Sequence, residues 1–316
     1  MYALLFPGQG SQAVGMGRDV FAASKAAREL FECADRTLGW SLTRLCFEGP
    51  KDELRRTENQ QPAILTTTIA LLRALEEGGP VSPAYVAGHS LGEYSALVAS
   101  GALDFEDALR LVHARGRYMQ EAVPEGFGAM AAVVGCDAMV VAEACARAAA
   151  ETGEVVTPAN YNAPQQTVIA GTAKAVELAC SKAREGGAKR VVELPVSAPF
   201  HCQLMAPAAA KLALELERVR FHEARPAVVS NVEAAPNSDP IRIRSLLETQ
   251  VTAAVRFTEM VQSLSSLGVA RVLEVGPGRV LTGLVARIER SLARANLSGV
   301  DELGSARSFL AGAAAG

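Results

Sequence analysis

Short apolar runs alternate with longer amphipathic segments along the N-terminal 125 residues of the chain. Residues 2–6 form one such run, which ends at Pro7-Gly8, and residues 85–87 form another. Runs of this length between turn residues predict buried strands. Segments with apolar residues at helical spacing predict helices at 19–48, 61–75, 91–100 and 105–122. Asp104 is placed to cap the last helix, and we interpret the alternation as an α/β domain.

Residues 126–194 follow a different order of elements. A strand at 128–134 precedes a helix, two short strands, a second helix and a strand that ends at Leu194. The order β-α-β-β-α-β is typical of a ferredoxin-like fold. We therefore expect one subdomain at 126–194, inserted into a larger one built from residues 1–125 and 195–316. The alternative, that this stretch continues the main sheet, stays open.

The C-terminal third returns to alternating strands and helices after a proline-bounded loop. Apolar runs predict strands at 227–230 and 271–275. Helical spacing predicts helices at 206–216, 241–250, 256–267 and 280–292. The tail after Ala306 is rich in alanine and glycine, so we expect it to be frayed.

Composition excludes several classes of protein. The chain has 316 residues, of which 49% are hydrophobic and 21% charged, and its net charge is −3. This is a globular composition without the basic excess of a nucleic-acid-binding protein. No apolar stretch approaches the about 20 residues of a membrane helix, and the N-terminus lacks the basic segment of a signal peptide. The six cysteines show neither a CxxC pair nor zinc-ligand spacing, so we expect buried reduced thiols, no metal centre and a cytoplasmic location.

The pentapeptide Gly88-His89-Ser90-Leu91-Gly92 carries the sharpest chemical signal. It has the pattern G-x-S-x-G and lies between an expected strand and an expected helix, which is the context of a nucleophile elbow. Flanking glycines let a serine hydroxyl stand clear of such a turn. The start of the helix also offers free N–H groups to a developing oxyanion. The alternative is a glycine-rich helix start capped by Ser90.

A serine nucleophile needs a base, and the chain has four histidines to offer. His89 is adjacent to Ser90, and neighbours cannot easily face each other across an elbow. His113 lies among charged residues, and His222 is typical of a surface histidine. His201 lies in the proline-bounded loop that follows an expected strand, and a histidine fixed at a strand end is a plausible general base.

Arg115 is the one charged residue on the inward stripe of the helix at 105–122. The stripe consists of Phe105, Ala108, Val112, Arg115 and Met119. Arginine is rarely buried unless it is paired. It can form an ion pair with an internal carboxylate, extend its charged end to solvent, or bind a substrate carboxylate with its planar fork. The spacing of residues along the helix does not distinguish these three interpretations.

A second glycine-rich turn, Phe6 to Gln12, follows the N-terminal strand. It could cradle a phosphate, but no Walker lysine follows it. It could equally place a backbone N–H beside the elbow and complete an oxyanion hole with the Leu91 N–H. Asn160, Asn162 and Gln250 are, taken alone, ordinary polar residues of turns or surfaces.

Together these motifs resemble those of the malonyl-CoA:acyl carrier protein transacylase family. The matching segments are Phe6–Gln12, Gly88–Glu93, Arg115, Asn160–Pro164, Pro199–His201 and Val275–Gly278. The spacings match as well, because Arg115 follows Ser90 by 25 residues and His201 follows it by 111. The resemblance extends from about residue 1 to about residue 295.

The resemblance implies an α/β-hydrolase-like core with a parallel sheet and a ferredoxin-like α+β insert. It implies a ping-pong reaction in which Ser90 takes malonyl from coenzyme A and passes it to the phosphopantetheine thiol of acyl carrier protein. His201 would be the base, oriented by the backbone carbonyl of Gln250 in place of a triad aspartate. Arg115 would bind the free malonyl carboxylate.

The resemblance also assigns three residues around the nucleophile. The backbone N–H groups of Gln9 and Leu91 would hold the oxyanion. Phe200 replaces the serine that free-standing fatty-acid enzymes often carry there, and it resembles the malonyl-selective acyltransferase domains of polyketide synthases. Leu91 points to malonyl too, because methylmalonyl-selective relatives often carry glutamine at that position. The expected partners are malonyl-CoA and acyl carrier protein, without a bound cofactor, in fatty acid or polyketide synthesis.

Two other classes of function share some of these features. An esterase or thioesterase of the α/β-hydrolase type has the same elbow, but it needs an acid partner and lets water finish the reaction. The inward Arg115 speaks against it. A non-catalytic module that docks a carrier protein would form no acyl-serine. The mass of the intact protein after mixing with malonyl-CoA separates the three.

Overall fold

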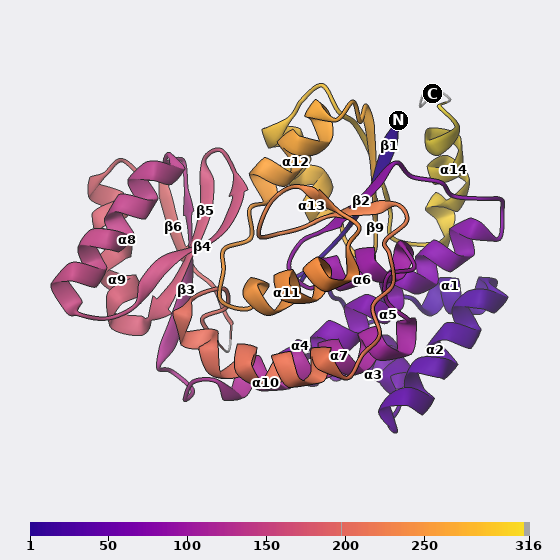
Figure 1. Ribbon diagram of the computed structural model, residues 1–316, viewed down its shortest axis with the longest axis horizontal. Coiled ribbons are helices and arrows are strands. Elements are labelled where there is room, and N and C mark those ends of the chain that lie inside the picture. Colours follow the sequence, from indigo (N-terminus) through magenta and orange to yellow (C-terminus); the bar gives the residue numbers. More distant parts are fainter. Residues whose placement is uncertain (197, 313–316) are drawn as a thin grey trace.

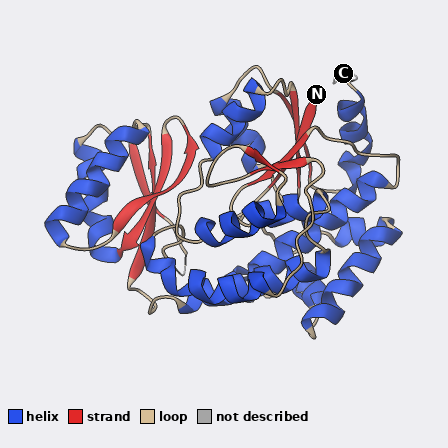
Figure 2. Ribbon diagram, in the orientation of Figure 1, coloured by secondary structure: helices blue, strands red, loops and turns tan. Residues whose placement is uncertain are grey.

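The computed structural model describes residues 1–196 and 198–312. Ser197, in the proline-bounded loop, and the last four residues of the tail lie outside this description. The described chain folds around two separate sheets, and Figure 2 shows them as two distinct groups of strands.

The larger sheet is centred on the N-terminal strand. This strand, β1, pairs in parallel with β2 on one side and with β9 on the other. The outer strands β7 and β10 are also parallel, and within the described part of this sheet only the short edge strand β8 is antiparallel. The order is β10 (Ala293–Leu297), β9 (Arg271–Val275), β1 (Tyr2–Phe6), β2 (Tyr85–Gly88), β7 (Ala227–Val229) and β8 (Pro236–Asn237).

Both faces of this sheet are covered, which explains why its central strands β1 and β2 are largely apolar. Leu4 and Phe6 point into a large cluster with the helices that include α2, α5, α6 and α7. Ala3 and Leu5 point to the opposite face, against α12 and α13. The helices of this part are α1 (Arg18–Ala23), α2 (Lys25–Leu38), α3 (Leu42–Glu48), α4 (Lys51–Arg55), α5 (Thr57–Glu76), α6 (Gly92–Ala99), α7 (Phe105–Glu121), α10 (Ala206–Glu217), α11 (Pro240–Gln250), α12 (Phe257–Ser266), α13 (Val280–Ile288) and α14 (Leu303–Ala311), with the 3₁₀ turns η1 (Gln203–Met205) and η2 (Val300–Glu302).

The smaller sheet forms a separate unit beside the larger one (Figure 1). Its strand order β4-β5-β3-β6, antiparallel throughout, is the ferredoxin-like order that the sequence predicts. The alternative, in which this stretch continues the main sheet, is wrong. Met130 and Val168 on one face join the core of the larger unit, while α8 and α9 cover the other face. The elements are β3 (Gly128–Val134), α8 (Ala138–Thr152), β4 (Val156–Ala163), β5 (Gln166–Thr172), α9 (Ala173–Glu185) and β6 (Arg190–Glu193).

The helix predicted at 19–48 and the cap predicted at Asp104 differ from the structure for local reasons. The stretch 19–48 is three helices rather than one. Ser24 interrupts it in an extended conformation and caps α2 with its side chain, and Gly39 ends α2 with a φ of 76°. Ser41 then caps α3. Asp104 does occupy the N-cap position of α7, but its side chain forms no capping hydrogen bond there.

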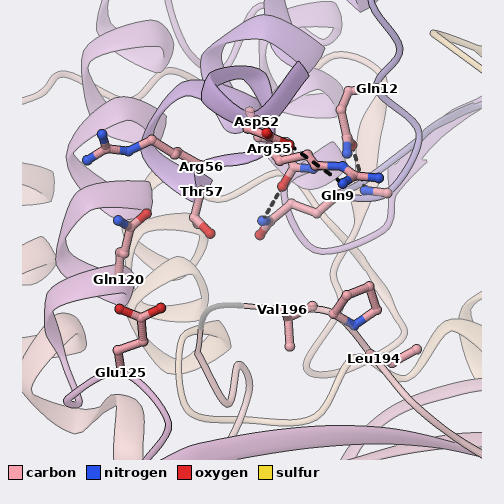
Figure 3. Close-up of a pocket in the computed structure, with 13 residues that line it drawn as sticks. Gln9, Gln12, Asp52, Arg55, Arg56, Thr57, Gln120, Glu125, Leu194 and Val196 are labelled. Atoms are coloured by element: carbon pink, nitrogen blue, oxygen red, sulfur yellow. Dashed lines mark hydrogen bonds and ion pairs between the residues drawn. The ribbon is translucent and has the colours of Figure 1, made fainter. Parts of the chain in front are cut away.

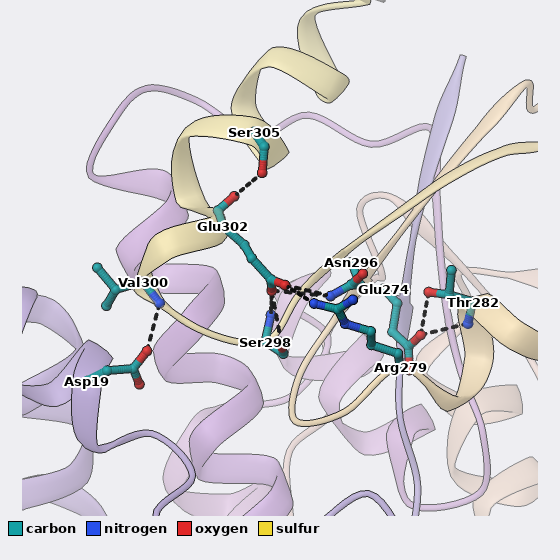
Figure 4. Close-up of polar contacts among 9 residues, drawn as sticks. All are labelled: Asp19, Glu274, Arg279, Thr282, Asn296, Ser298, Val300, Glu302 and Ser305. Carbon is teal, nitrogen blue, oxygen red and sulfur yellow. Dashed lines mark hydrogen bonds and ion pairs between the residues drawn. The ribbon is translucent and has the colours of Figure 1, made fainter. Parts of the chain in front are cut away.

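The C-terminal region is more ordered than the sequence predicts. The helix expected at 280–292 ends at Ile288, because Glu289 is extended and residues 289–292 lead the chain into β10. Of the tail expected to fray, residues 307–311 instead belong to α14, which ends at Ala311. For residues 313–316 the prediction lies outside the described residues. Glu302 holds its start by accepting hydrogen bonds from the Ser298 N–H and the Asn296 amide and by pairing with Arg279 (Figure 4).

Helices α5 and α7 approach each other closely at Gly116, which follows Arg115. A Cβ on Gly116 would lie 2.5 Å from the Thr57 carbonyl oxygen and 2.7 Å from the Glu58 Cα. We therefore expect Gly116→Ala to lower the free energy of unfolding by about 1–3 kcal/mol, because backbone atoms must move to admit the methyl group.

Urea denaturation measures this change. The matched control is Gly283→Ala in α13, where an added Cβ meets nothing within 4 Å. The control should keep or slightly raise stability, because alanine favours helix over glycine. Equal stability of the two variants would show that α7 does not lie against α5 as described.

Candidate active site

The elbow at residues 88–92 has the strand–turn–helix geometry that the sequence predicts. Ser90 adopts a φ of +52°, in the left-handed region that few residues other than glycine occupy. A Cβ on Gly88 would lie 2.0 Å from the Gly92 carbonyl, and one on Gly92 would lie 2.0 Å from the Phe6 carbonyl. Both positions therefore require glycine. Ser90 does not cap the helix, because Leu91 occupies the N-cap position and the Ser90 hydroxyl faces His201.

Ser90 and His201 form a buried hydrogen-bonded pair. The Ser90 Oγ and the His201 Nε2 are 2.7 Å apart. The other ring nitrogen, Nδ1, is 2.9 Å from the backbone carbonyl oxygen of Gln250. A carbonyl only accepts, so Nδ1 carries the hydrogen and Nε2 is left free to accept the serine proton.

Burial and the nearby guanidinium of Arg115 lower the pKa of His201 to about 3. Burial is the larger cause, because desolvation disfavours the charged imidazolium. The imidazole is therefore neutral across the physiological range and ready to accept a proton.

Arg115 is 1% exposed and lies beside the nucleophile. Its Nη2 donates to the Ser90 Oγ at 3.1 Å and to the Gln250 Oε1 at 3.0 Å, and its Nη1 donates to the Gln61 Oε1 at 2.7 Å. In the described part of the chain no carboxylate forms an ion pair with it, so the reading as a structural ion pair is wrong. The side chain does not extend to solvent either. A buried cation held by neutral oxygens is suited to bind an anion.

The turn from Phe6 to Gln12, called here the oxyanion loop after the role that the family resemblance implies, packs directly on the elbow. A Cβ on Gly8 would lie 2.4 Å from the His89 carbonyl oxygen. The Gln9 side chain donates to the Gln60 Oε1 at 2.7 Å. The backbone N–H groups of Gln9 and Leu91 have no hydrogen-bond partner within the described residues, as an oxyanion hole requires.

A cavity of about 760 Å³ opens beside the oxyanion loop. Gln9 and Gln12 lie on one side of it, and Gln120 and Glu125 lie on the other (Figure 3). Ser90, His201 and Arg115 are not among its lining residues and lie deeper in the protein. The full lining is Gln9, Gly10, Gln12, Asp52, Arg55, Arg56, Thr57, Gln60, Gln120, Glu125, Leu194, Pro195 and Val196.

The smaller sheet reaches the elbow through β4. His89 and Asn162 share a hydrogen bond of 2.7 Å between Nε2 and Oδ1. The Tyr161 N–H donates to the Val255 carbonyl at 2.9 Å, and the Val255 N–H donates to the Ala159 carbonyl at 2.9 Å. Asn162, an ordinary polar residue by its sequence context, thus joins the two sheets beside the nucleophile.

Sequence reasoning missed three polar residues that hold the site. Gln61 binds Arg115, and Glu93 accepts a hydrogen bond from the Gln250 side chain at 2.7 Å. Asn231, fully buried after β7, accepts from the Ser90 N–H at 2.6 Å and donates to the Gly88 carbonyl at 2.7 Å. Their spacing in the sequence carries no signal. Glu93 stands in a motif quoted for the family resemblance, but without a role.

The remaining expectations concern other side chains. Phe200 is buried in the core next to His201 and does not line the cavity. All six cysteines are free, but Cys33 is only half-buried, contrary to the prediction.

Within residues 1–196 and 198–312, no cluster of three or more His, Cys, Asp or Glu could hold a metal ion. None of the helices in these ranges has the length and apolar character needed to cross a bilayer.

Asn231 holds both sides of the strained turn, so we expect Asn231→Ala to weaken it. The change leaves the Ser90 N–H and the Gly88 carbonyl buried without partners, at a cost of about 1–3 kcal/mol. Labelling of Ser90 by a fluorophosphonate should slow by about tenfold or more, because a misplaced nucleophile loses attack geometry. Asn237→Ala on the edge strand is the control, and equal labelling rates in the two variants would contradict the role of Asn231.

Comparisons with known proteins agree with this geometry. The profile of the acyl transferase domain matches residues 3–307. The malonyl CoA-acyl carrier protein transacylase of Escherichia coli K12 is 48% identical over 297 residues, 94% of this chain and 96% of that protein. The crystal structure of an acyl carrier protein S-malonyltransferase from Vibrio cholerae superposes with a TM-score of 0.94 at 45% identity, covering 96% of this chain and 99% of the other.

A malonyl-transacylase solved in complex with a type II polyketide synthase acyl carrier protein is equally similar. It has a TM-score of 0.94 and 45% identity, and the match covers 96% of this chain and 98% of that one. These likenesses confirm the family resemblance and the predicted fold class. The chain belongs to the acyl transferase family and, within it, to the malonyl-CoA:acyl carrier protein transacylases.

Proposed function

We propose that this protein transfers malonyl from coenzyme A to acyl carrier protein through a malonyl ester on Ser90. One observation carries the proposal. The Ser90 hydroxyl lies 2.7 Å from a neutral histidine and 3.1 Å from a buried arginine that has no carboxylate partner among the described residues. A nucleophile, a base and an anion-binding group thus meet at one oxygen atom.

In the first half-reaction, Ser90 attacks the thioester carbonyl of malonyl-CoA. The Ser90 proton passes to the His201 Nε2 as the new C–O bond forms. The backbone N–H groups of Gln9 and Leu91 stabilise the oxyanion. When the C–S bond breaks, His201 returns the proton to the departing thiolate of coenzyme A. The Gln250 carbonyl keeps the imidazole in the required tautomer and stabilises the transient imidazolium.

In the second half-reaction, the phosphopantetheine thiol of acyl carrier protein attacks the malonyl ester. His201 accepts the thiol proton and then donates it to the Ser90 oxygen as the ester bond breaks, which regenerates the enzyme. The cavity beside Gln9 is the route by which either pantetheine arm reaches the site. Phe200 and Leu91 contribute to selection of the malonyl group. The product serves fatty acid or polyketide synthesis.

The organisation and location of the protein complete the proposal. Residues 1–125 and 195–316 form the catalytic subdomain, and residues 126–194 form the ferredoxin-like one, since the two sheets share no described strand. The protein acts in the cytoplasm, where its six free cysteines stay reduced and where coenzyme A esters are available as substrates.

The proposal predicts that Ser90→Ala abolishes the acyl-enzyme while the fold survives, because the change removes one hydroxyl group. Intact-mass spectrometry after mixing with malonyl-CoA measures the malonyl adduct, and circular dichroism checks the fold. Ser95→Ala, in the helix that follows the elbow, is the matched control and should still form the adduct. An adduct on Ser90→Ala, or free malonate released at the transfer rate without an acceptor thiol, would overturn the proposal.

Arg115→Ala tests the binding of the malonyl carboxylate. A charge-assisted hydrogen bond contributes about 1.5–3 kcal/mol, so kcat/KM for malonyl-CoA should fall by about two orders of magnitude or more. Acetyl-CoA lacks the carboxylate, so its kcat/KM should hold steady or rise. Arg115→Lys should restore malonyl transfer only in part, because an ammonium lacks the planar fork. Equal losses for both substrates would mean that Arg115 has a structural role.

A further inference from the structure

We propose that Glu93 is a positioning residue for malonyl selection, which acts on Arg115 through the side-chain amide of Gln250. The proposal rests on the function proposed above and adds a residue to its machinery. It concerns the side chain of Gln250, whereas the orientation of His201 concerns the Gln250 backbone carbonyl. Gln250 thus contacts the base through its backbone and the carboxylate-binding arginine through its side chain. Glu93 holds the side chain.

Glu93 is a carboxylate enclosed in the first turn of α6, with 4% of its surface exposed. Its Oε2 accepts hydrogen bonds from the Gln250 Nε2 at 2.7 Å and from the Asn231 N–H at 3.1 Å. Within the described residues it has no ion pair. Burying a carboxylate costs free energy, which hydrogen bonds offset only in part. The two hydrogen bonds of Glu93 connect it to two residues, Gln250 and Asn231, that both contact Ser90.

The hydrogen bond to Glu93 helps to fix the orientation of the Gln250 side-chain amide. Its Nε2 donates to the Glu93 Oε2 and to the Ser90 carbonyl, the latter at 3.1 Å. Its Oε1 is therefore turned toward Arg115 and accepts from Nη2 at 3.0 Å. A flipped amide would direct its NH₂ group at the guanidinium, where two donors would oppose each other. Without Glu93 one reason for the observed orientation disappears, and Arg115 loses a fixed partner.

The charge of Glu93 is set by its surroundings. The charged or titratable groups that act on it are Arg115 on α7 and Tyr94 on α6. His201 in turn interacts electrostatically with Arg115 and with His89. Burial raises the pKa of Glu93 to about 7, against the opposing effects of Gln250, Asn231 and Arg115. Its carboxylate therefore forms as the pH rises through neutrality. Malonylation should rise over the same range, since the pKa of His201 is about 3 and lies far below it.

Ionisation of Glu93 also has a defined effect on stability. The folded-state pKa lies above the ordinary value of 4.5, so the unfolded chain loses this proton at lower pH than the folded chain does. The contribution of Glu93 to stability is thus present below pH 4.5 and is lost as the pH rises toward 7. Glu93→Gln removes this ionisation, so its Tm at pH 8 should equal or exceed that of the unmodified protein.

The test compares Glu93→Gln with Glu274→Gln. Glu274 is also a buried carboxylate, 1% exposed, but it accepts hydrogen bonds from the Leu281 and Thr282 N–H groups at the start of α13. Figure 4 shows its contact with Thr282, and within the described residues none of its hydrogen bonds goes to Ser90, Gln250 or Arg115. We expect the malonylation rate of Glu93→Gln, followed by rapid-quench intact mass, to fall by about tenfold to a hundredfold. Acetylation should fall less, since acetyl does not use Arg115. Glu274→Gln should stay within about twofold of the unmodified rate.

The pH profile provides the second measurement. In the unmodified protein the malonylation rate should rise between pH 6 and pH 8 with a midpoint of about 7, and in Glu93→Gln this rise should be absent. A flat profile in the unmodified protein overturns the proposal even if the variant does not fold. Equal losses of malonylation and acetylation, accompanied by a lower Tm, would show a structural role instead. A different result would contradict the proposed function itself, namely that the unmodified protein forms no malonyl ester on Ser90.

Discussion

The site is built around a buried guanidinium that forms no ion pair within residues 1–196 and 198–312. Arg115 lies next to the nucleophile and is held by neutral oxygens of Gln61, Gln250 and Ser90. A cation in such surroundings is costly, and the cost falls when a carboxylate binds. Under the proposed function, the free energy of substrate binding is thus partly the relief of this unfavourable state. An acyl group without a carboxylate receives no such gain, so selectivity and binding have the same origin.

The second constraint is the shape of the turn that carries Ser90. A serine with a φ of +52° is strained, and three surrounding segments hold it in place. The oxyanion loop packs against the turn through Gly8, Asn231 holds the turn by hydrogen bonds on both sides, and Asn162 of the smaller sheet bonds to His89. These segments lie far apart in the sequence. The strained turn is therefore a product of the whole fold rather than of the pentapeptide.

Whether the sequence predicts a feature depends on how far apart along the chain the interacting residues lie. Local signals predict the strand before Ser90, the helix after it and the inward stripe that contains Arg115, because periodicity acts over a few turns. They do not predict α14, because Ser298, Asn296 and Arg279 stabilise it from outside its own segment. Asn231 and Gln61 escape prediction for the same reason. A lone amide gains its role only when the fold brings it to a partner 54 or 141 residues away.

The choice of a backbone carbonyl to orient His201 follows from the same buried cation. A triad aspartate at the position of the Gln250 carbonyl would place a full negative charge within the network that contains Arg115. Its attraction to the guanidinium would compete with the substrate carboxylate and weaken the selection of malonyl. The carbonyl still accepts the Nδ1–H bond and fixes the tautomer, but it adds only a dipole. Glu93 already places one carboxylate in this network, where it bonds to the Gln250 amide rather than to the guanidinium. Under the proposed function, a backbone carbonyl adds no second carboxylate there and leaves Arg115 available to the substrate.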